Sequence, residues 1–336
     1  MARVAAVLKA LARAVARDQK SVESVVGNNF FFVSALLLRQ AGTFIYLIIG
    51  LVLLFPLSTD PLRKIPASRL ALWPLDARDH RLLRVLSPWI NPMTWLLAGL
   101  ALWAGRGKIT LGLWALAAGL VAAGFLLSDL PFAPADSLKR SIPRFPGLLN
   151  QLIRKNLREI LSTLDIYCAL LLSLLTLLFR LLGRPLPKEA LLALSILVVL
   201  ALSSYAQCLF GLDGRAGISR YHLLPLRGWQ ILAAKDAALL AILILLLLPV
   251  AWLAGMAAAL VALAFGHGPS VQTVRPQMRW RFSTGSSVML GILQAMSMGA
   301  AGAAVFLSST WFVLPCAVAW LISLWAAGRA FERGAA

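Results

Sequence analysis

The chain has 336 residues, of which 60% are apolar and 13% are charged, and its mean hydropathy is +0.83. Soluble domains are usually about 45–50% apolar and about 25% charged, so this composition excludes an ordinary soluble domain and predicts several membrane crossings. The 32 lysines and arginines outnumber the 13 acidic residues and give a net charge of +19. These basic residues lie in short segments between apolar runs and form no basic soluble domain, so we expect no nucleic-acid binding.

The first predicted element is an amphipathic helix within residues 1–20. Its apolar side chains form one stripe: Val4, Val7, Leu8, Leu11 and Val15. Basic side chains form a second stripe and interrupt any continuous apolar region, so we expect no signal-peptide cleavage. The pattern favours a helix that lies along a membrane surface, and an organellar transit peptide is the alternative.

Five apolar stretches follow, at about residues 28–58, 92–128, 160–210, 237–266 and 287–328. Each contains a break, at Arg39–Gln40, Gly105–Lys108, Arg180–Lys188, Pro249 or Gly255, and Ser308–Thr310. Broken apolar stretches of this kind predict helical hairpins, and hence an all-α polytopic membrane protein with ten membrane helices. The legs of the first and fourth hairpins have only about 13–15 residues, and a span needs about 20. A count of eight spans, with re-entrant or interfacial segments, is therefore the alternative.

The basic residues indicate the orientation of these hairpins. Of the 32 lysines and arginines, 26 fall in the terminal segments and in the long segments between hairpins, and 6 fall at the hairpin tips. Because cytoplasmic loops carry the excess of lysine and arginine, both termini are expected in the cytoplasm. The composition is typical of a bacterial inner membrane. The three cysteines lie in apolar runs, so no disulfide framework is expected.

An internal repeat relates residues 69–84 to residues 220–235, and both fit the pattern R-x-x-L-x-P-L-x9-[KR]. The matched pairs are Arg69 with Arg220, Leu72 with Leu223, Pro74 with Pro225, Leu75 with Leu226, and Arg84 with Lys235. The match indicates a duplicated unit. Each copy predicts a short amphipathic helix that a proline begins and that lies on the cytoplasmic surface before the next span. The segment either anchors the bundle or forms a rigid knob for a soluble partner.

The stretch FGLDGRAGISRYHLLPLRGWQILAAKDA, residues 210–237, resembles a segment of ABC-type exporter permeases of the type-2 class. In that family the segment joins the second and third membrane helices and couples them to a separate ATP-binding subunit. The resemblance matches the acidic turn to Asp213 and Gly214, the central run to Leu223, Leu224, Pro225 and Leu226, and the exit to Ile231, Leu232 and Lys235. It implies apolar partner contacts at Leu223, Leu224 and Trp229. Acidic partner groups or anionic lipids of the cytoplasmic leaflet are then expected at Arg220, Arg227 and Lys235.

The resemblance extends over residues 148–330 and implies a six-helix core. Residues 148–164 resemble the elbow helix that opens such permeases, and residues 267–286 resemble the basic intracellular loop of the family. We therefore divide the chain into an N-terminal membrane half (1–128), a cytoplasmic linker (129–147) and a permease-like core (148–336). The N-terminal half resembles a truncated second copy, with an elbow helix and two hairpins. Whether one chain forms a complete translocation unit or must form a homodimer stays open.

The motifs of the rival enzyme classes are incomplete. Residues 105–110 come nearest to the phosphate-binding loop G-x4-G-K-[ST] but lack its first glycine and the hydroxyl after the lysine. Residues 213–216 share Asp-Gly with the signature of CDP-alcohol phosphotransferases, but the downstream aspartate pair is absent. The three histidines, His80, His222 and His267, are scattered and are expected at interfaces rather than around a metal. We therefore expect no catalytic site, cofactor or metal in this chain.

Two polar residues inside the last stretch, Gln294 and Ser297, share one helix face. They either support close helix packing through a hydrogen bond of the glutamine or line a substrate path. The sequence as a whole predicts a permease subunit of an ATP-driven exporter, in which a partner subunit hydrolyses the ATP. The alternatives are a membrane scaffold or assembly protein without an ATPase and a lipid-modifying membrane enzyme. No span carries a charged constellation that names a substrate.

Overall fold

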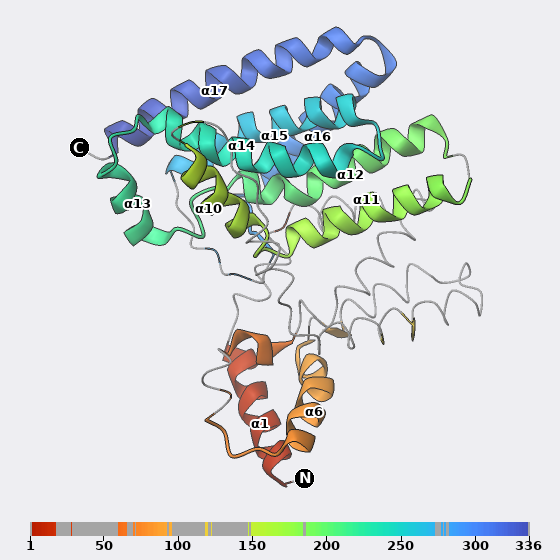
Figure 1. Ribbon diagram of the computed structural model, residues 1–336, viewed down its shortest axis with the longest axis vertical. Coiled ribbons are helices and arrows are strands. Elements are labelled where there is room, and N and C mark those ends of the chain that lie inside the picture. Colours follow the sequence, from red (N-terminus) through yellow and green to blue (C-terminus); the bar gives the residue numbers. More distant parts are fainter. Residues whose placement is uncertain are drawn as a thin grey trace. The chain divides into compact units, whose positions relative to one another are not determined.

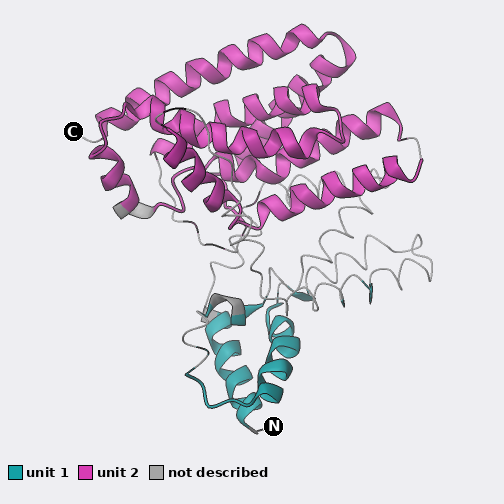
Figure 2. Cartoon of the chain, in the orientation of Figure 1, with its two compact units in different colours: residues 1–23, 45–133 teal, residues 24–44, 134–336 magenta. Residues whose placement is uncertain are grey.

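The computed structural model describes residues 2–17, 28, 60–65, 70, 72–92, 94–95, 118–119, 122, 147, 149–183, 186–272, 277, 279 and 282–334. Two compact units divide the chain, one of residues 1–23 and 45–133 and the other of residues 24–44 and 134–336 (Figure 2). Most of the predicted hairpins at 28–58 and 92–128, and all of the 129–147 linker except Gly147, lie outside the described residues. These elements remain predictions.

The described part of the first unit consists of α1 (Ala2–Arg17), η1 (Pro61–Lys64), α6 (Ala77–Leu86) and η2 (Ser87–Ile90). The amphipathic N-terminal helix is confirmed as α1. Its apolar stripe, however, packs on protein, because Val4 and Leu11 form a buried cluster with Leu62 of η1 and Leu83 of α6. The expectation that this stripe lies on a membrane surface is therefore wrong for its buried positions. Packing against α6 already removes those side chains from water.

Among the described residues, the helices that are long and apolar enough to span a membrane lie in the second unit (Figure 1). Its elements are α10 (Asn150–Ile160), α11 (Asp165–Leu181), α12 (Lys188–Ala206), α13 (Gly214–His222), α14 (Gly228–Leu247), α15 (Trp252–Gln272), α16 (Val288–Leu307), η3 (Thr310–Phe312) and α17 (Val313–Arg333). Among the described residues, five segments are long and apolar enough to span a membrane: α12, α14, α15, α16, and η3 with α17. The number of such segments is six if α10 and α11, which are bent by 80° relative to each other, are counted together as one broken span. The chain is an all-α polytopic membrane protein, as the sequence predicts.

The predicted breaks of the last three apolar stretches are confirmed. α11 ends at Leu181, and Gly183, with φ of +68°, turns the chain toward α12. The break around Pro249 separates α14 from α15, and the Ser308–Thr310 break separates α16 from η3 and α17. The three connections lie at one end of this unit, whereas α10, α13 and the C-terminal end of α17 lie at the other (Figure 1).

The fourth hairpin is longer than its apolar stretch. The two legs, α14 and α15, have 20 and 21 residues, because the helices extend past the apolar run to include Lys235 and Asp236 on one leg and His267 on the other. The expectation of short legs is therefore wrong for this hairpin. Each of the three ionisable side chains finds a partner of its own inside the bundle, which makes its inclusion in a span tolerable.

Helix α15 packs against α12, α16 and α17, and small residues allow the close approach. Ala257, Ala258 and Ala259 are completely buried. At Gly266, an added Cβ would lie 2.2 Å from the carbonyl oxygen of Ala206 on α12. Small residues bring helix backbones close together and strengthen van der Waals packing within a membrane bundle.

The amphipathic helix predicted within residues 148–164 is confirmed as α10, which packs on α14. Its apolar side chains Ile153, Leu157 and Ile160 are buried, and Lys155 and Arg158 of the opposite face are exposed. Two polar side chains of α10, Asn156 and Glu159, are also buried. The amphipathic pattern explains the first set and not the second, which belongs to the polar cluster described next.

Candidate functional site

Residues 223–227 form a short exposed loop between α13 and α14. Leu223 is 84% exposed, and Leu224 and Trp229 are also exposed. The loop is nevertheless fixed by backbone hydrogen bonds, from Leu224 N to Tyr221 O at 3.1 Å and from Leu226 N to Leu224 O at 2.8 Å. The backbone N–H of Arg227 also donates to Oε1 of Gln230, at 2.8 Å. A solvent-exposed leucine thus stands on an ordered backbone.

The first unit contains the same loop at the other copy of the repeat. Trp73 N donates to Leu70 O at 3.1 Å, and Leu75 N donates to Trp73 O at 2.8 Å, so both hydrogen bonds join positions equivalent to those in the second unit. Leu72, the equivalent of Leu223, is 81% exposed. The residues that precede the two following helices, Asp76 and Arg227, have nearly the same backbone angles, with φ of -75° and -72° and ψ of 162° and 150°. The sequence repeat is therefore a repeat of local structure.

The helix predicted after the proline differs between the two copies. In the first unit α6 begins at Ala77, three residues after Pro74, and is a separate short helix. In the second unit the equivalent residue, Gly228, begins the long helix α14, so the expected surface helix after Pro225 is wrong. The buried side chains of Ile231 and Leu232 make these turns part of the span, and the short helix of this copy, α13, precedes the loop.

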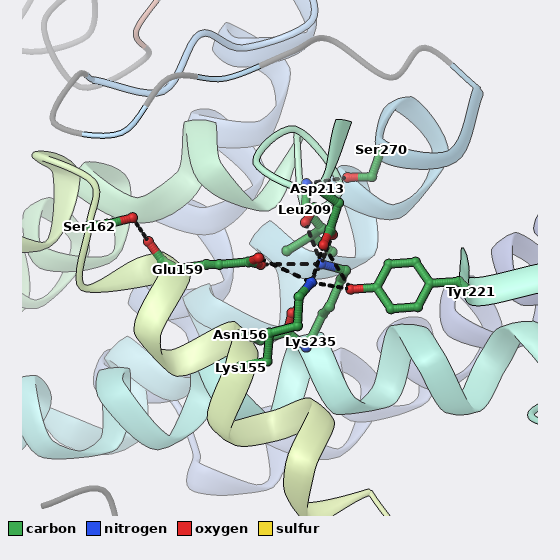
Figure 3. Close-up of polar contacts among 9 residues, drawn as sticks. All are labelled: Lys155, Asn156, Glu159, Ser162, Leu209, Asp213, Tyr221, Lys235 and Ser270. Carbon is green, nitrogen blue, oxygen red and sulfur yellow. Dashed lines mark hydrogen bonds and ion pairs between the residues drawn. The ribbon is translucent and has the colours of Figure 1, made fainter. Parts of the chain in front are cut away.

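Lys235 lies in the interior of the protein, where polar groups of α10 and of the turn before α13 surround its ammonium group (Figure 3). Its ammonium group donates to Oδ2 of Asp213 at 2.7 Å, to the carbonyl oxygen of Leu209 at 2.8 Å and to Oδ1 of Asn156 at 3.1 Å. These three contacts use all three N–H donors of an ammonium group. The expectation that Lys235 meets a partner or lipid charge is therefore wrong, because internal groups satisfy its side chain.

Asp213 is the centre of a polar cluster that we call the clamp. Its other members are Lys155, Asn156, Glu159, Tyr221 and Lys235 (Figure 3). Oδ1 of Asp213 accepts hydrogen bonds from Lys155 and, at 2.9 Å, from the hydroxyl of Tyr221. Lys155 also pairs with Glu159, 3.0 Å away on the same helix. The clamp thus holds two ammonium groups and two carboxylates with no net charge, and it joins α10, the turn before α13, α13 and α14. Asp213 is buried and is therefore a support of the loop rather than a surface contact.

The electrostatics of the clamp favour an ionised Asp213. Burial alone would raise the pKa of Asp213, but the charges and hydrogen bonds of Lys235 and Lys155 hold it below its usual value. The pKa of Tyr221 is raised above its usual range by burial and by the adjacent Asp213 carboxylate. Tyr221 is therefore a neutral hydrogen-bond donor to Asp213 at physiological pH.

Helix α17 holds the loop from a second side. The carboxylate of Glu332 accepts a hydrogen bond of 2.7 Å from the backbone N–H of Gly228, at the start of α14. The two helices touch so closely that a Cβ on Gly228 would lie 2.3 Å from the carbonyl oxygen of Gly328. On the α13 side, the ring of His222 stacks on Phe331, with centroids 4.7 Å apart. The loop is therefore fixed to α10, α14 and α17.

The remaining predicted site residues lie in different places. Arg220, Pro225 and Arg227 are exposed beside Leu223, and Leu226 is half-buried. Gly214 is the first residue of α13. In the first unit Pro74 and Arg84 are exposed, and Arg69 lies outside the described residues. The structure therefore brings the surface residues of the second copy together around one loop.

Gln294 is completely buried and connects three helices. Its Nε2 donates to Ala262 O of α15 at 2.8 Å, and its Oε1 accepts from Nε2 of Gln207, just after α12, at 2.6 Å. Gln207 in turn accepts a hydrogen bond of 2.7 Å from the backbone N–H of Ser286. This geometry supports the packing interpretation of Gln294, and Ser297, one turn further along α16, is half-buried.

Sequence reasoning missed two further buried polar clusters. In the first, Asp165 accepts hydrogen bonds from Asn28 at 2.9 Å and from the backbone and hydroxyl groups of Ser283 at 2.9 and 2.5 Å. In the second, Asp236 pairs with His267. The available signal for the second cluster was an aspartate directly after Lys235 and directly before an apolar stretch. Within the described residues, no group of three or more His, Cys, Asp and Glu side chains is placed to hold a metal ion.

The comparisons with known proteins do not add to this picture. No protein-family model, curated protein or solved structure matches the chain. The geometry of the loop and its supports is therefore the basis for a proposed function.

Proposed function

We propose that the protein is the permease subunit of an ATP-driven, ABC-type exporter, and that the loop at Leu223 docks a separate ATP-binding subunit. The observation that carries the proposal is the pairing of an exposed leucine with a fixed backbone. Leu223 is 84% exposed, while residues before and after it in the chain are hydrogen-bonded to side chains of α10, α14 and α17. A force on such a loop would move helices rather than bend the loop.

The duplicated loop supports the same proposal. Leu72 and Leu223 offer equivalent apolar contacts on equivalent backbones, which suits a partner that presents the same socket twice. In this proposal Arg220 and Arg227 contact acidic groups of the partner or of the membrane surface.

The distribution of charge supports a cytoplasmic position for the loop. The end of the second unit that carries α10 and α13 also carries the basic side chains Arg154, Lys155, Arg158, Arg220, Arg227 and Arg333. By the positive-inside rule this end and the C-terminus face the cytoplasm, and the same rule, applied to the basic N-terminal segment itself, assigns the N-terminus to the cytoplasm in this proposal. A bacterial inner membrane is part of this proposal, because the chain is an integral membrane protein rich in alanine, leucine and arginine.

The experiment is affinity purification in mild detergent from the native host, followed by identification of bound chains and an ATPase assay. We expect an ATP-hydrolysing subunit to co-purify with the parent chain. Leu223→Asp should reduce its recovery and ATPase stimulation roughly tenfold or more, because a charge would then enter an apolar contact. The matched control is Leu182→Asp, which places the same charge at a 65% exposed leucine in the α11–α12 connection.

Two outcomes would count against the proposal. Equal recovery of the subunit with Leu223→Asp and with the parent would remove the loop from the docking surface. Purification of the parent chain without any ATP-hydrolysing companion would favour the alternative, a membrane scaffold that keeps the fold but performs no transport.

A further inference from the structure

A second buried polar cluster, separate from the clamp, lies where α14, α15 and α17 pack together. Asp236 on α14 and His267 on α15 are both 0% exposed, and Oδ2 of the aspartate lies 2.9 Å from Nε2 of the histidine. The indole N–H of Trp320 donates to the same Oδ2 at 2.8 Å. The other ring nitrogen of His267, Nδ1, lies 3.0 Å from the hydroxyl of Ser323.

The hydrogen bond of Ser323 identifies the atom that carries a proton on the imidazole. The Ser323 hydroxyl donates its one hydrogen to the carbonyl oxygen of Ala264, at 2.7 Å. With that hydrogen on Ala264, the hydroxyl accepts a hydrogen bond from His267, and Nδ1 carries a hydrogen in this arrangement. At 2.9 Å, the Nε2 and Oδ2 atoms also need a hydrogen between them, because two lone pairs at that distance would repel. The arrangement therefore holds one proton more than a carboxylate beside a neutral imidazole.

The same atoms allow a second arrangement without that proton. If Nδ1 loses its hydrogen, the Ser323 hydroxyl can rotate from Ala264 to donate to Nδ1. His267 then keeps its hydrogen on Nε2, facing the aspartate. The two arrangements differ by one proton and one hydroxyl rotation, and neither needs a movement of the backbone. They also differ in charge, because the pair is neutral with the proton and carries one negative charge without it.

The charged and titratable groups on the packed elements have other contacts. Lys235, the neighbour of Asp236 on α14, is held in the clamp with Lys155 and Glu159 of α10. On α17, Arg329 lies over the ring of Trp325 at 3.9 Å and Glu332 accepts from Gly228 N. The other titratable or charged groups on packed elements are Arg154 and Arg158 on α10, Asp165, Tyr167, Cys168 and Arg180 on α11, Lys188, Glu189 and Tyr205 on α12, and Cys316 and Arg333 on α17, and α16 has none. Among the described groups, the proton itself is what balances the charge of the pair.

We propose that Asp236 and His267 form a proton-binding site inside the helix bundle, with the hydroxyl of Ser323 as its rotating partner. Ionisable pairs within membrane spans are rare because an uncompensated charge there is costly, and known pairs of this kind often carry protons. Occupancy by the proton tightens the hold of α15 and α17 on α14. Since Lys235 and Asp236 are adjacent on α14, this site and the clamp act on the same turn of one helix.

A hydrolase triad is the rival interpretation of an Asp, a His and a Ser in contact. In the arrangement with the extra proton, the hydroxyl of Ser323 donates its hydrogen to Ala264 and not to the histidine. Ser323 also lies in the interior of α17, where backbone N–H groups are committed to helical hydrogen bonds and cannot stabilise an oxyanion. The geometry therefore favours proton binding over nucleophilic attack.

The test is nitrogen NMR of the histidine ring in the purified chain, with no partner present. The chain has three histidines, so a His80→Gln/His222→Phe background leaves His267 as the sole signal, and the phenylalanine retains a ring against Phe331. Spectra recorded from about pH 5 to pH 9 should distinguish the two arrangements, one with hydrogens on both ring nitrogens and one with hydrogen on Nε2 only, and their exchange should be reversible. The parent chain, with His80 and His222 assigned from the single variants, provides the same readout if the double background does not fold.

Two further variants decide the assignment. Asp236→Asn should remove the doubly protonated ring over the same pH range, because the amide offers no negative charge. Ser323→Ala removes the hydrogen-bond partner of Nδ1 in both arrangements and should shift the balance between the two ring states, while the Asp236 contact stays in place. A ring that does not change between about pH 5 and pH 9, or one that changes identically in Asp236→Asn, would overturn the proposal. Because no partner is used, neither result depends on the docking of an ATP-binding subunit.

Discussion

The side chains of Lys235 and Asp213 form an ion pair of 2.7 Å in which both groups are almost completely buried. The pair joins the turn before α13 to α14 and is one half of a neutral set that includes Lys155 and Glu159. A buried pair of this kind matters less for the energy it adds than for the cost of breaking it. Removing one partner of this pair is therefore expected to cost more stability than removing both partners together.

The first prediction is a charge-balanced comparison of two variants. Asp213→Asn leaves the set with one uncompensated positive charge and should destabilise the chain by about 3–5 kcal/mol. Asp213→Asn with Lys235→Met restores the balance and should recover most of that loss, because methionine keeps an apolar chain of similar length. Thermal unfolding in detergent measures both. Equal destabilisation of the single and double variants would show that the charge balance of the clamp is unimportant.

The second prediction concerns acid. Because the pKa of Asp213 is lower in the folded chain than its ordinary value of 3.8, its ionised form stabilises the fold. This contribution is complete above about pH 4 and is lost as the pH falls through the lowered pKa. The thermal stability of the parent should therefore decrease between about pH 4 and pH 2 by more than that of Asp213→Asn. Parallel curves for the two proteins over this range would contradict the prediction.

The third prediction compares two glycines of one helix. At Gly266 an added Cβ would lie 2.2 Å from Ala206 O, whereas at Gly268 no heavy atom lies within 4 Å of the added Cβ. Gly266→Ala should force α12 and α15 apart and cost about 1–3 kcal/mol. Gly268→Ala should be neutral or stabilise by up to about 1 kcal/mol through its better helix propensity. Unfolding curves of the two variants provide the comparison, and a harmless Gly266→Ala would contradict the close contact.

The fourth prediction concerns the hydrogen bonds around Asp165. This carboxylate holds the segment at Ser283 through two hydrogen bonds and holds Asn28 through a third. Asp165→Ala should release the segment and accelerate tryptic cleavage after the nearby Arg279, which is exposed. The control is Asp165→Asn, in which the amide oxygen can still accept from Ser283 and should slow cleavage again. Digestion followed by mass spectrometry gives both rates, and unchanged cleavage in Asp165→Ala would show that other contacts hold this segment.

Much of the fold of the second unit was predictable from the sequence. The breaks at Arg180–Lys188, around Pro249 and at Ser308–Thr310 are local features of composition, and helices cannot continue through them. The apolar face of α10 follows from its helical periodicity. The repeat around Leu72 and Leu223 could also be predicted, because the residues that the two copies share stand at the same spacing and both copies form the same turn.

The candidate site was predictable only at its surface. Leu223, Pro225 and Arg227 lie in the exposed loop, as the resemblance implies, but Lys235 and Asp213 lie behind it in the clamp. Sequence spacing places Lys235 on a helix and does not give the direction in which that helix leaves the surface. The partners of Lys235 come from α10 and from the turn before α13, and only the packed bundle brings them within hydrogen-bonding distance.

Three properties follow from the sequence alone: the all-α polytopic membrane class, the positions at which the last three hairpins turn, and the occurrence of one loop twice. These properties depend on the composition and order of neighbouring residues. The pairing of ionisable groups inside the bundle is visible only in the tertiary structure. This pairing explains how α14 and α15 can extend through Asp236 and His267. The reason is physical: a charge can enter a span only with a partner, and the partners lie on other helices, far away in the chain.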